Sequence, residues 1–176
     1  MKKNIVMLTI IILFCSMGVS YAYESHFGPA GVVYYDTDKA YEGYTRFNEC
    51  KLFDGVKEVL KKIRDMEISQ SILSASKEDV LIEKIKYYTI DKYFCRIIGL
   101  DNHYAESKVE RGKKWIAELN LNPQDVLLIG DTAHDYIVSK HIGSDCLLIA
   151  NGHYSYERLA KLGVEVINSL KEITKI

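Results

Sequence analysis

The amino-acid sequence predicts an α/β domain built on a doubly wound parallel sheet. Segments with strand and helix character alternate from Leu52 to the C-terminus, at the spacing of successive βαβ units. The strand at 126–129 is a continuous apolar run, which is typical of a parallel strand that is covered on both faces. With 176 residues, 48% of them hydrophobic, the chain is long enough to bury the core of one domain.

The expected elements carry local signals at their ends. Asp54-Gly55 precedes the first helix, Ser76 and Asp79 have the spacing of a capping box, and Gly143 is placed to end a helix. In order, we expect a helix at 56–64, a strand at 68–73, a helix at 77–88, a short strand or turn at 93–98, a helix at 107–119, a strand at 126–129, a helix through 136–141, a strand at 146–150, a helix at 154–162 and a strand at 164–167.

Residues 1–22 have the outline of a secretory signal peptide. Lys2 and Lys3 give a basic start, residues 5–19 are almost wholly apolar, and Ala22 is a small residue at the cleavage position. Two alternatives stay open: an uncleaved membrane anchor, for which the apolar run is short, and a first β-strand. A signal or anchor predicts an exported or membrane-associated protein, with membrane contact through this leader, whereas a strand predicts a cytoplasmic one.

Residues 23–51 form the segment whose structure is hardest to predict. Residues 31–35 favour a strand because they are β-branched and aromatic, and residues 40–47 have the pattern of an amphipathic helix with an aromatic face. The chain therefore divides into a leader at 1–22, this uncertain segment, which is a degenerate first strand or a remnant of a second domain, and a core at 52–176.

Charge and cysteine content exclude several classes of protein. The net charge is −1 and the charges of opposite sign are interspersed, so no nucleic-acid partner is expected. The four cysteines lie far apart without a C-x-x-C pair, which favours neither a zinc site nor a disulfide framework.

Two carboxylates mark the expected site. Asp131 follows the strand at 126–129 after Gly130, and Asp135 lies one helical turn further on. Ligands of open α/β sheets bind at the carboxyl ends of the strands. Two acids this close repel each other unless a cation lies between them, and Mg²⁺ prefers oxygen ligands of this kind. The alternative is that Asp131 or Thr132 only caps the following helix.

These residues also carry a resemblance to a family. Ser74 at a strand end, Lys108, and the run from Gly130 to Asp135 follow the order and spacing of the second, third and fourth motifs of the haloacid dehalogenase-like (HAD) phosphatases. The start of the core at 52–56 resembles members of the phosphoglycolate-phosphatase type. The resemblance implies a HAD-like Rossmannoid core whose cap domain is absent or vestigial, and a Mg²⁺-dependent phosphatase of a small phosphorylated metabolite.

The resemblance also implies roles for the residues that match the motifs. Family members form an aspartyl-phosphate intermediate. Mg²⁺ would be held by Asp131 and Asp135, and Ser74 and Lys108 would bind the phosphate. Lys108 is expected to face the surface and to contribute little to the stability of the fold.

The first motif, Asp-x-Asp, is matched only at Asp36-Thr37-Asp38. Asp36 would be the nucleophile and a third Mg²⁺ ligand, and Asp38 the acid/base. Lys39 and Ala40 depart from the usual Gly and from Thr or Val. The segment at 34–52 also resembles the last helix of a cap domain with its linker. The alternative is therefore a truncated or catalytically inactive domain that lacks the nucleophile.

Overall fold

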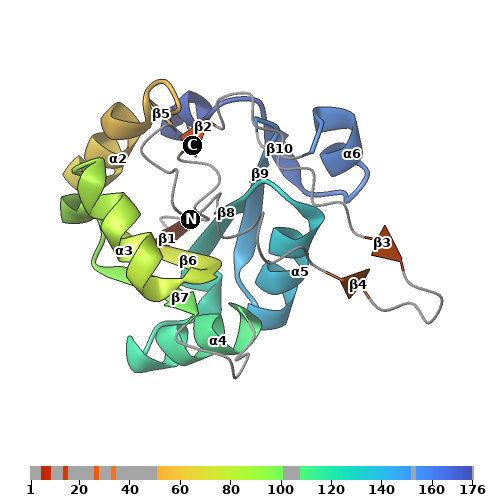
Figure 1. Ribbon diagram of the computed structural model, residues 1–176, viewed down its shortest axis with the longest axis horizontal. Helices are drawn as coiled ribbons and strands as arrows, with labels where there is room; N and C mark the ends of the chain where they lie inside the picture. The colour runs from red at the N-terminus through yellow and green to blue at the C-terminus, as the bar shows by residue number, and fades with distance from the viewer. Residues whose placement is uncertain are drawn as a thin grey trace.

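A single parallel sheet organises the part of the chain that the structure describes. The computed structural model describes residues 5–8, 14–15, 26–27, 33–34, 51–100, 108–151 and 154–175. The six-stranded sheet has the order β10-β9-β8-β1-β6-β7, and every pairing in it is parallel (Figure 1). The predicted α/β fold is thereby confirmed. The strands are β1 Ile5–Leu8, β6 Ser69–Lys77, β7 Arg96–Leu100, β8 Val126–Gly130, β9 Asp145–Ile149 and β10 Glu165–Ile167.

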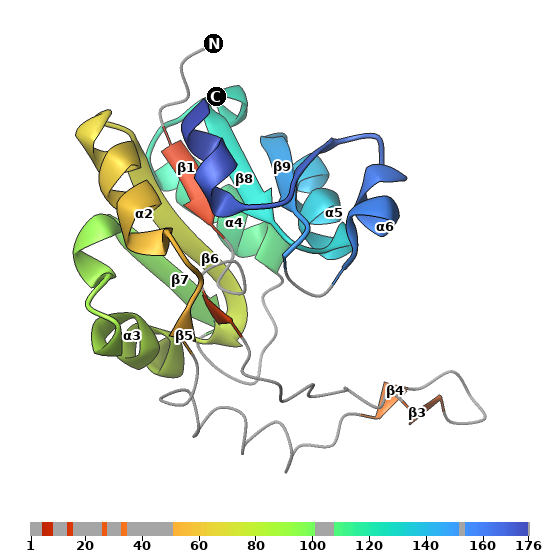
Figure 2. The same ribbon diagram turned by 90° about the horizontal axis from the view of Figure 1, so that it is seen from above.

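Helices cover both faces of this sheet (Figure 2). On one face lie α2 (Val56–Asp65), α3 (Glu78–Tyr87) and the 3-10 helix η5 (Leu170–Lys175). On the other lie α4 (Lys108–Glu118) and α5 (Ala133–Ile142). The short helix α6 (Tyr156–Ala160) precedes β10, and the 3-10 helices η3 (Asp91–Tyr93) and η4 (Pro123–Asp125) precede β7 and β8.

Successive residues of the central strands feed these two layers in turn. Ile72 and Ile129 pack into the cluster under α2 and α3, whereas Leu73 and Leu128 pack into the cluster under α4 and α5. All four side chains are fully buried. Because side chains of a strand alternate between the faces of a sheet, a strand with a helical layer on each face must be apolar throughout. This explains the continuous apolar run that predicted the strand.

β1 comes from the predicted leader. It pairs with β6 from Ile5↔Ser69 to Leu8↔Ile72 and with β8 from Ile5↔Val126 to Leu8↔Ile129. Residues 5–8 thus adopt the strand that was one alternative for this stretch. Removal of the leader stays an untested prediction. Within the described residues, none of the helices has the length and apolar character that a membrane span requires.

Two short antiparallel pairs lie outside the main sheet: β2 (Phe14–Cys15) with β5 (Lys51–Leu52), and β3 (His26–Phe27) with β4 (Val33–Tyr34). β4 overlaps the strand expected at 31–35. The helix expected at 40–47 and the two aspartates of the first motif, Asp36 and Asp38, lie outside the described residues.

The ends of two helices differ from the sequence predictions. The prediction of a capping box at Ser76 and Asp79 is wrong. Lys77 is the N-cap of α3, and no side-chain hydrogen bond caps that helix. β6 continues to Lys77, so Ser76 belongs to a strand, and Asp79 instead accepts a bond from Lys77 Nζ at 2.6 Å. The helix expected at 154–162 spans only Tyr156–Ala160. Gly143 does end α5, with φ +80°, a conformation that glycine adopts without strain.

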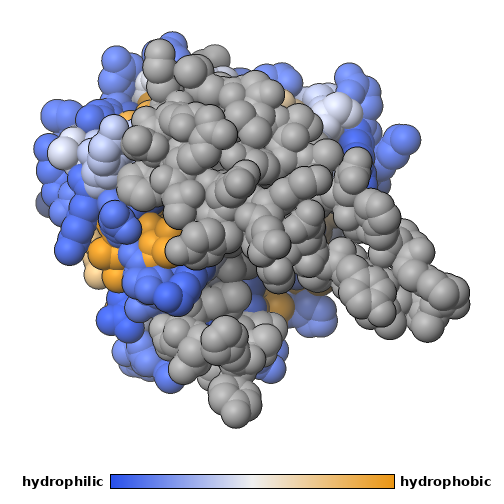
Figure 3. Space-filling view, viewed as in Figure 1, coloured by the Kyte–Doolittle hydropathy of each residue, from blue (hydrophilic) through white to orange (hydrophobic). Residues whose placement is uncertain are grey.

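On the face shown in Figure 3, the described residues that can be seen are mainly hydrophilic, and only small hydrophobic areas appear among them. This agrees with the interspersed charges of the sequence.

Candidate active site

Four of the predicted site residues are buried at one edge of the sheet. Ser74 lies near the carboxyl end of β6, and Asp131 follows the carboxyl end of β8. β1 runs between these two strands. Lys108 begins α4 and Asp135 lies in the first turn of α5. The exposed fractions of the four residues are 9% or less. The structure therefore places these groups where open α/β sheets bind their ligands.

Lys108 and Asp135 form a buried ion pair across two helices. The Nζ of Lys108 lies 2.5 Å from Oδ1 of Asp135, and the side chains are 8% and 5% exposed. The prediction that Lys108 faces the surface is wrong. A buried ammonium has lost its water, so it depends on the carboxylate beside it.

The other oxygen of Asp135 holds the loop before α5. Oδ2 accepts bonds from the backbone N–H of Asp131 at 3.2 Å, the N–H of Thr132 at 3.1 Å and the Thr132 hydroxyl at 2.8 Å. The Thr132 hydroxyl in turn accepts from the Asp135 N–H at 3.3 Å, which completes a capping box. Thr132 is thus a helix cap, and Asp135 fixes both Lys108 and the loop that carries Asp131.

Gly130 is required where the strand ends. A Cβ atom built on Gly130 would overlap Cβ and Cγ of Asp135. Only glycine lets the strand end approach the Asp135 side chain this closely. The glycine that marks the end of the strand in the sequence therefore permits the contact between the loop and its capping carboxylate.

Ser74 keeps a donor for a ligand. Its Oγ accepts a bond from the backbone N–H of Ser76 at 3.0 Å. This bond uses a lone pair of the oxygen and leaves the hydroxyl proton for another acceptor. Donation of that proton to a phosphate oxygen stays a prediction.

Two of the three predicted Mg²⁺ ligands, Asp131 and Asp135, lie among the described residues. The described residues contain no group of three or more His, Cys, Asp or Glu side chains that could hold a metal ion. Of the three predicted ligands, Asp36 lies outside the described residues, and both oxygens of Asp135 accept bonds from protein donors. Asp131 is a buried carboxylate at the strand end, as a hard cation requires. Asp131 therefore fits Mg²⁺ as a direct ligand, and Asp135 fits as a support of the loop that carries Asp131.

Arg111 is a half-buried cation that sequence reasoning missed. It lies one turn after Lys108 on α4, donates a bond to the carbonyl of Gly99 on β7, and lies 3.9 Å from Glu78 of α3. Glu78 also accepts from the Gly99 N–H at 3.0 Å. These contacts fasten α4 to β7 and to the start of α3, and so fix the helix that carries Lys108. The sequence did contain a signal for Arg111: it follows Lys108 by three residues, and residues three apart lie on the same face of a helix.

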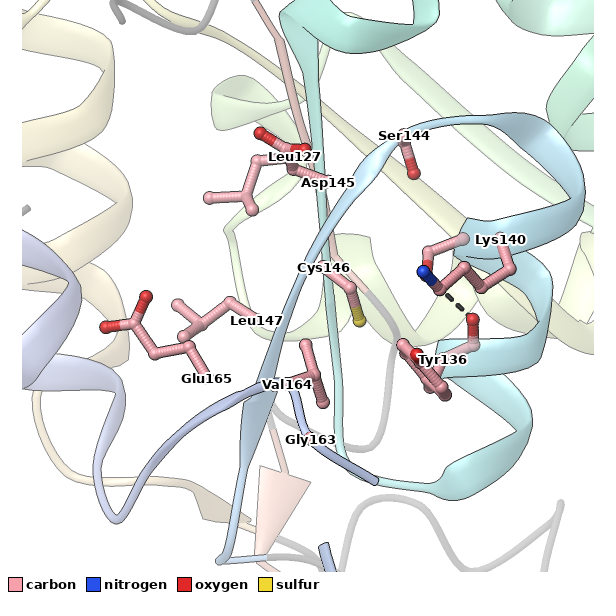
Figure 4. Close-up of a pocket in the computed structure, with 11 residues that line it drawn as sticks. Leu127, Tyr136, Lys140, Ser144, Asp145, Cys146, Leu147, Gly163, Val164 and Glu165 are labelled. Carbon is pink, nitrogen blue, oxygen red and sulfur yellow. Dashed lines mark hydrogen bonds between the residues drawn. The ribbon is translucent and has the colours of Figure 1, made fainter. Parts of the chain in front are cut away.

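A cavity of about 420 Å³ lies away from these residues. It opens between α5 and the starts of β9 and β10, and Tyr136, Lys140, Cys146 and Val164 line it (Figure 4). Because the strands are parallel, the cavity lies at the amino end of the sheet, opposite the end that carries Asp131.

Burial raises the pKa of the Cys146 thiol to about 11, so the thiol stays protonated and unreactive at neutral pH.

Comparison with known proteins identifies a family model and several relatives. The model described as haloacid dehalogenase-like hydrolase matches residues 15–149. The pyrophosphatase PpaX of Listeria monocytogenes is 28% identical over 90 residues, which are 51% of this chain and 42% of the relative. A soluble P-type ATPase-like phosphatase of Methanocaldococcus jannaschii is 28% identical over 160 residues, 89% of this chain and 53% of the relative. The chain spans about half the length of the curated relatives that it matches.

Solved structures share the fold over nearly the whole chain. A predicted phosphatase from Clostridium acetobutylicum has a TM-score of 0.79 at 16% identity and covers 99% of this chain and 98% of its own. A haloacid dehalogenase-like family protein from Streptococcus pneumoniae has a TM-score of 0.80 at 17% identity, with 98% and 97% covered. At these identities the likeness concerns the fold alone.

Proposed function

The chain belongs to the haloacid dehalogenase-like hydrolases, and on this premise we propose that it is a phosphatase of a small phosphorylated molecule. The observation that carries the proposal is the buried cation Lys108 at the strand ends that bear Ser74 and Asp131. A phosphoryl group is an anion, and a buried ammonium and a hydroxyl donor at the same edge of the sheet are suited to bind it. The relatives named as pyrophosphatase and phosphatase agree with this class of substrate.

The described residues would divide the work of binding phosphate. An ammonium has three N–H donors, and Lys108 gives one to Asp135, which leaves donors for two phosphoryl oxygens. Ser74 would donate its hydroxyl proton to a third oxygen. Asp131 would hold Mg²⁺, which when bound neutralises charge on the phosphoryl oxygens. Asp135 would position Lys108 and the loop.

The covalent step would rest on the first motif. Asp36 would attack phosphorus to give an aspartyl-phosphate, while Asp38 protonates the oxygen of the leaving group. Asp38 would then take a proton from the water that hydrolyses this intermediate. For this step Asp36 must reach the edge of the sheet between Ser74 and Asp131.

One observation favours a second candidate function, the binding of phosphate without turnover. The strand that lies between β6 and β8 is β1, and the sequence contains neither Asp nor Glu before Glu24. The residues directly after β1 therefore offer no carboxylate to act as a nucleophile. On this alternative, Ser74 and Lys108 bind phosphate, and no aspartyl-phosphate forms.

Hydrolysis of p-nitrophenyl phosphate, with and without Mg²⁺, separates the two candidates. The proposal expects turnover that depends on Mg²⁺ and is lost in Asp36→Asn. The control Asp91→Asn changes an exposed aspartate at the start of η3, and it should leave turnover unchanged. Binding of inorganic phosphate without turnover, at equal affinity in wild type and Asp36→Asn, would instead establish the second candidate.

A further inference from the structure

The backbone of β1 is paired on both of its sides. Four successive residues, Ile5 to Leu8, pair with β6, and the same four pair with β8. Both pairings are parallel and run without a shift in register. In the described sheet, β6 and β8 meet only through β1. The two halves of the sheet are therefore joined by a stretch that has the composition of a secretory leader.

The strands beside β1 belong to the centre of the core. Ile72 and Leu73 of β6 and Leu128 and Ile129 of β8 are fully buried. Neighbouring strands lie about 4.8 Å apart, so the loss of β1 would leave a gap of about 10 Å between β6 and β8. The backbone groups along this gap would lose their partners in a place that water does not reach, which native proteins avoid. The two halves could close the gap only by repacking both helical layers.

We infer that residues 5–8 are a permanent strand of the folded domain, so that cleavage of the leader near Ala22 and the folded core exclude each other. A newly made chain then has two fates: the leader enters the export route, or it inserts between β6 and β8. Every folded molecule of this protein would therefore keep residues 5–8. This inference holds whether or not the chain hydrolyses a phosphate ester, so it stands apart from the proposed function.

The first test uses the full chain expressed with its own N-terminus. Intact-mass measurement on the folded fraction, defined by one cooperative thermal transition, is expected to show a chain that still contains residues 5–8. A folded fraction whose chain begins at Tyr23 or beyond, and which unfolds in one cooperative transition, would overturn the inference.

The second test compares two substitutions by proline, Met7→Pro in β1 and Ser155→Pro before α6. Proline removes a ladder hydrogen bond and is not tolerated in a strand that is paired on both sides. Ser155 is exposed and has φ −71°, which proline adopts without strain. Met7→Pro should abolish the cooperative transition, and Ser155→Pro should keep it. A cooperative transition in Met7→Pro like that of Ser155→Pro would refute the role of β1.

Discussion

The burial of the Lys108–Asp135 ion pair predicts how substitutions of these residues change the free energy of unfolding, whether or not the site binds a ligand. Asp135→Ala leaves the ammonium of Lys108 buried without its carboxylate. Breaking a buried ion pair by removing one partner costs about 3–5 kcal/mol. The same substitution removes the three hydrogen bonds to Oδ2 and with them the capping box of α5. Loss of a helix cap typically costs about 0.5–2 kcal/mol more. Since domains are stable by about 5–15 kcal/mol, Asp135→Ala should bring the protein close to unfolding.

The complementary substitution, Lys108→Met, should cost less. Asp135 then loses one donor and keeps the three on Oδ2, so its carboxylate stays hydrogen-bonded. We expect a loss of about 1–3 kcal/mol, the range for a buried group that loses one bond. In the double variant no unpaired ammonium remains buried. The two losses should therefore not add, and the coupling energy should lie at about 0.5–3 kcal/mol.

Urea unfolding of the wild type, both single variants and the double variant measures these free energies. Lys113→Met is the matched control, because Lys113 is an exposed lysine on the same helix. It should change the free energy of unfolding by no more than about 0.5 kcal/mol. The reasoning is refuted if Lys108→Met behaves like Lys113→Met, or if the losses of the two single variants add in the double variant.

Three further predictions concern single positions. Asp131→Asn should weaken Mg²⁺ binding and any turnover together, because the ion depends on that charge; unchanged Mg²⁺ affinity by calorimetry would remove Asp131 from the site. Gly55→Ala should lower the free energy of unfolding by about 1–2 kcal/mol for its φ of +80° alone, with more for the overlap of the new methyl with the Lys171 side chain. Urea unfolding measures this loss, and Lys171→Ala in the same background should recover only the part due to overlap. Burial raises the pKa of Cys146 from 9.0 to about 11, so at pH 8 this residue has about a hundredfold less thiolate than a thiol with the ordinary pKa. Iodoacetamide should therefore modify Cys146 much more slowly than the exposed Cys95, and the rate at Cys146 should rise as the pH approaches 11. Peptide mass mapping after timed exposure checks this, and equal rates at the two thiols would contradict it.

The pattern of apolar residues along the sequence predicted the fold but not which side chains contact each other. A parallel strand that is covered on both faces has consecutive apolar residues, so these runs predicted a sheet with a helical layer on each face. The capping pattern shows the limit. Ser76 with Asp79 and Thr132 with Asp135 have the same spacing, yet only the second pair caps a helix. The difference is that β6 extends through Ser76, and this depends on pairing with β7, which lies farther along the chain.

The burial of Lys108 illustrates the same limit within the site. Its residue type and its place at the start of a helix favoured a solvent-facing lysine. The partner that allows burial, Asp135, is 27 residues away along the chain and becomes a neighbour only when α4 packs on α5. The spacing of Lys108, Gly112 and Ile116 on the buried side of α4 was a usable signal. A lysine that heads such a stripe needs a buried counter-charge.

The leader shows why hydropathy alone could not choose between export and fold. A bilayer, an export channel and the centre of a parallel sheet all favour apolar side chains. The apolar run of residues 5–19 is longer than the four residues of β1 and shorter than a span of about 20 residues, so its length excludes neither. The backbone adds an observation that composition does not give: residues 5–8 form a strand that pairs with β6 and β8. Export and removal of the leader stay untested predictions.

The catalytic question follows from the same placement of β1. β1 lies between the strands of Ser74 and Asp131, and the sequence contains neither Asp nor Glu between β1 and Glu24. The proposal that Asp36 is the nucleophile therefore requires that this residue return to the strand end. Loss of turnover in Asp36→Asn with phosphate affinity retained would show that residue 36 returns to the strand end.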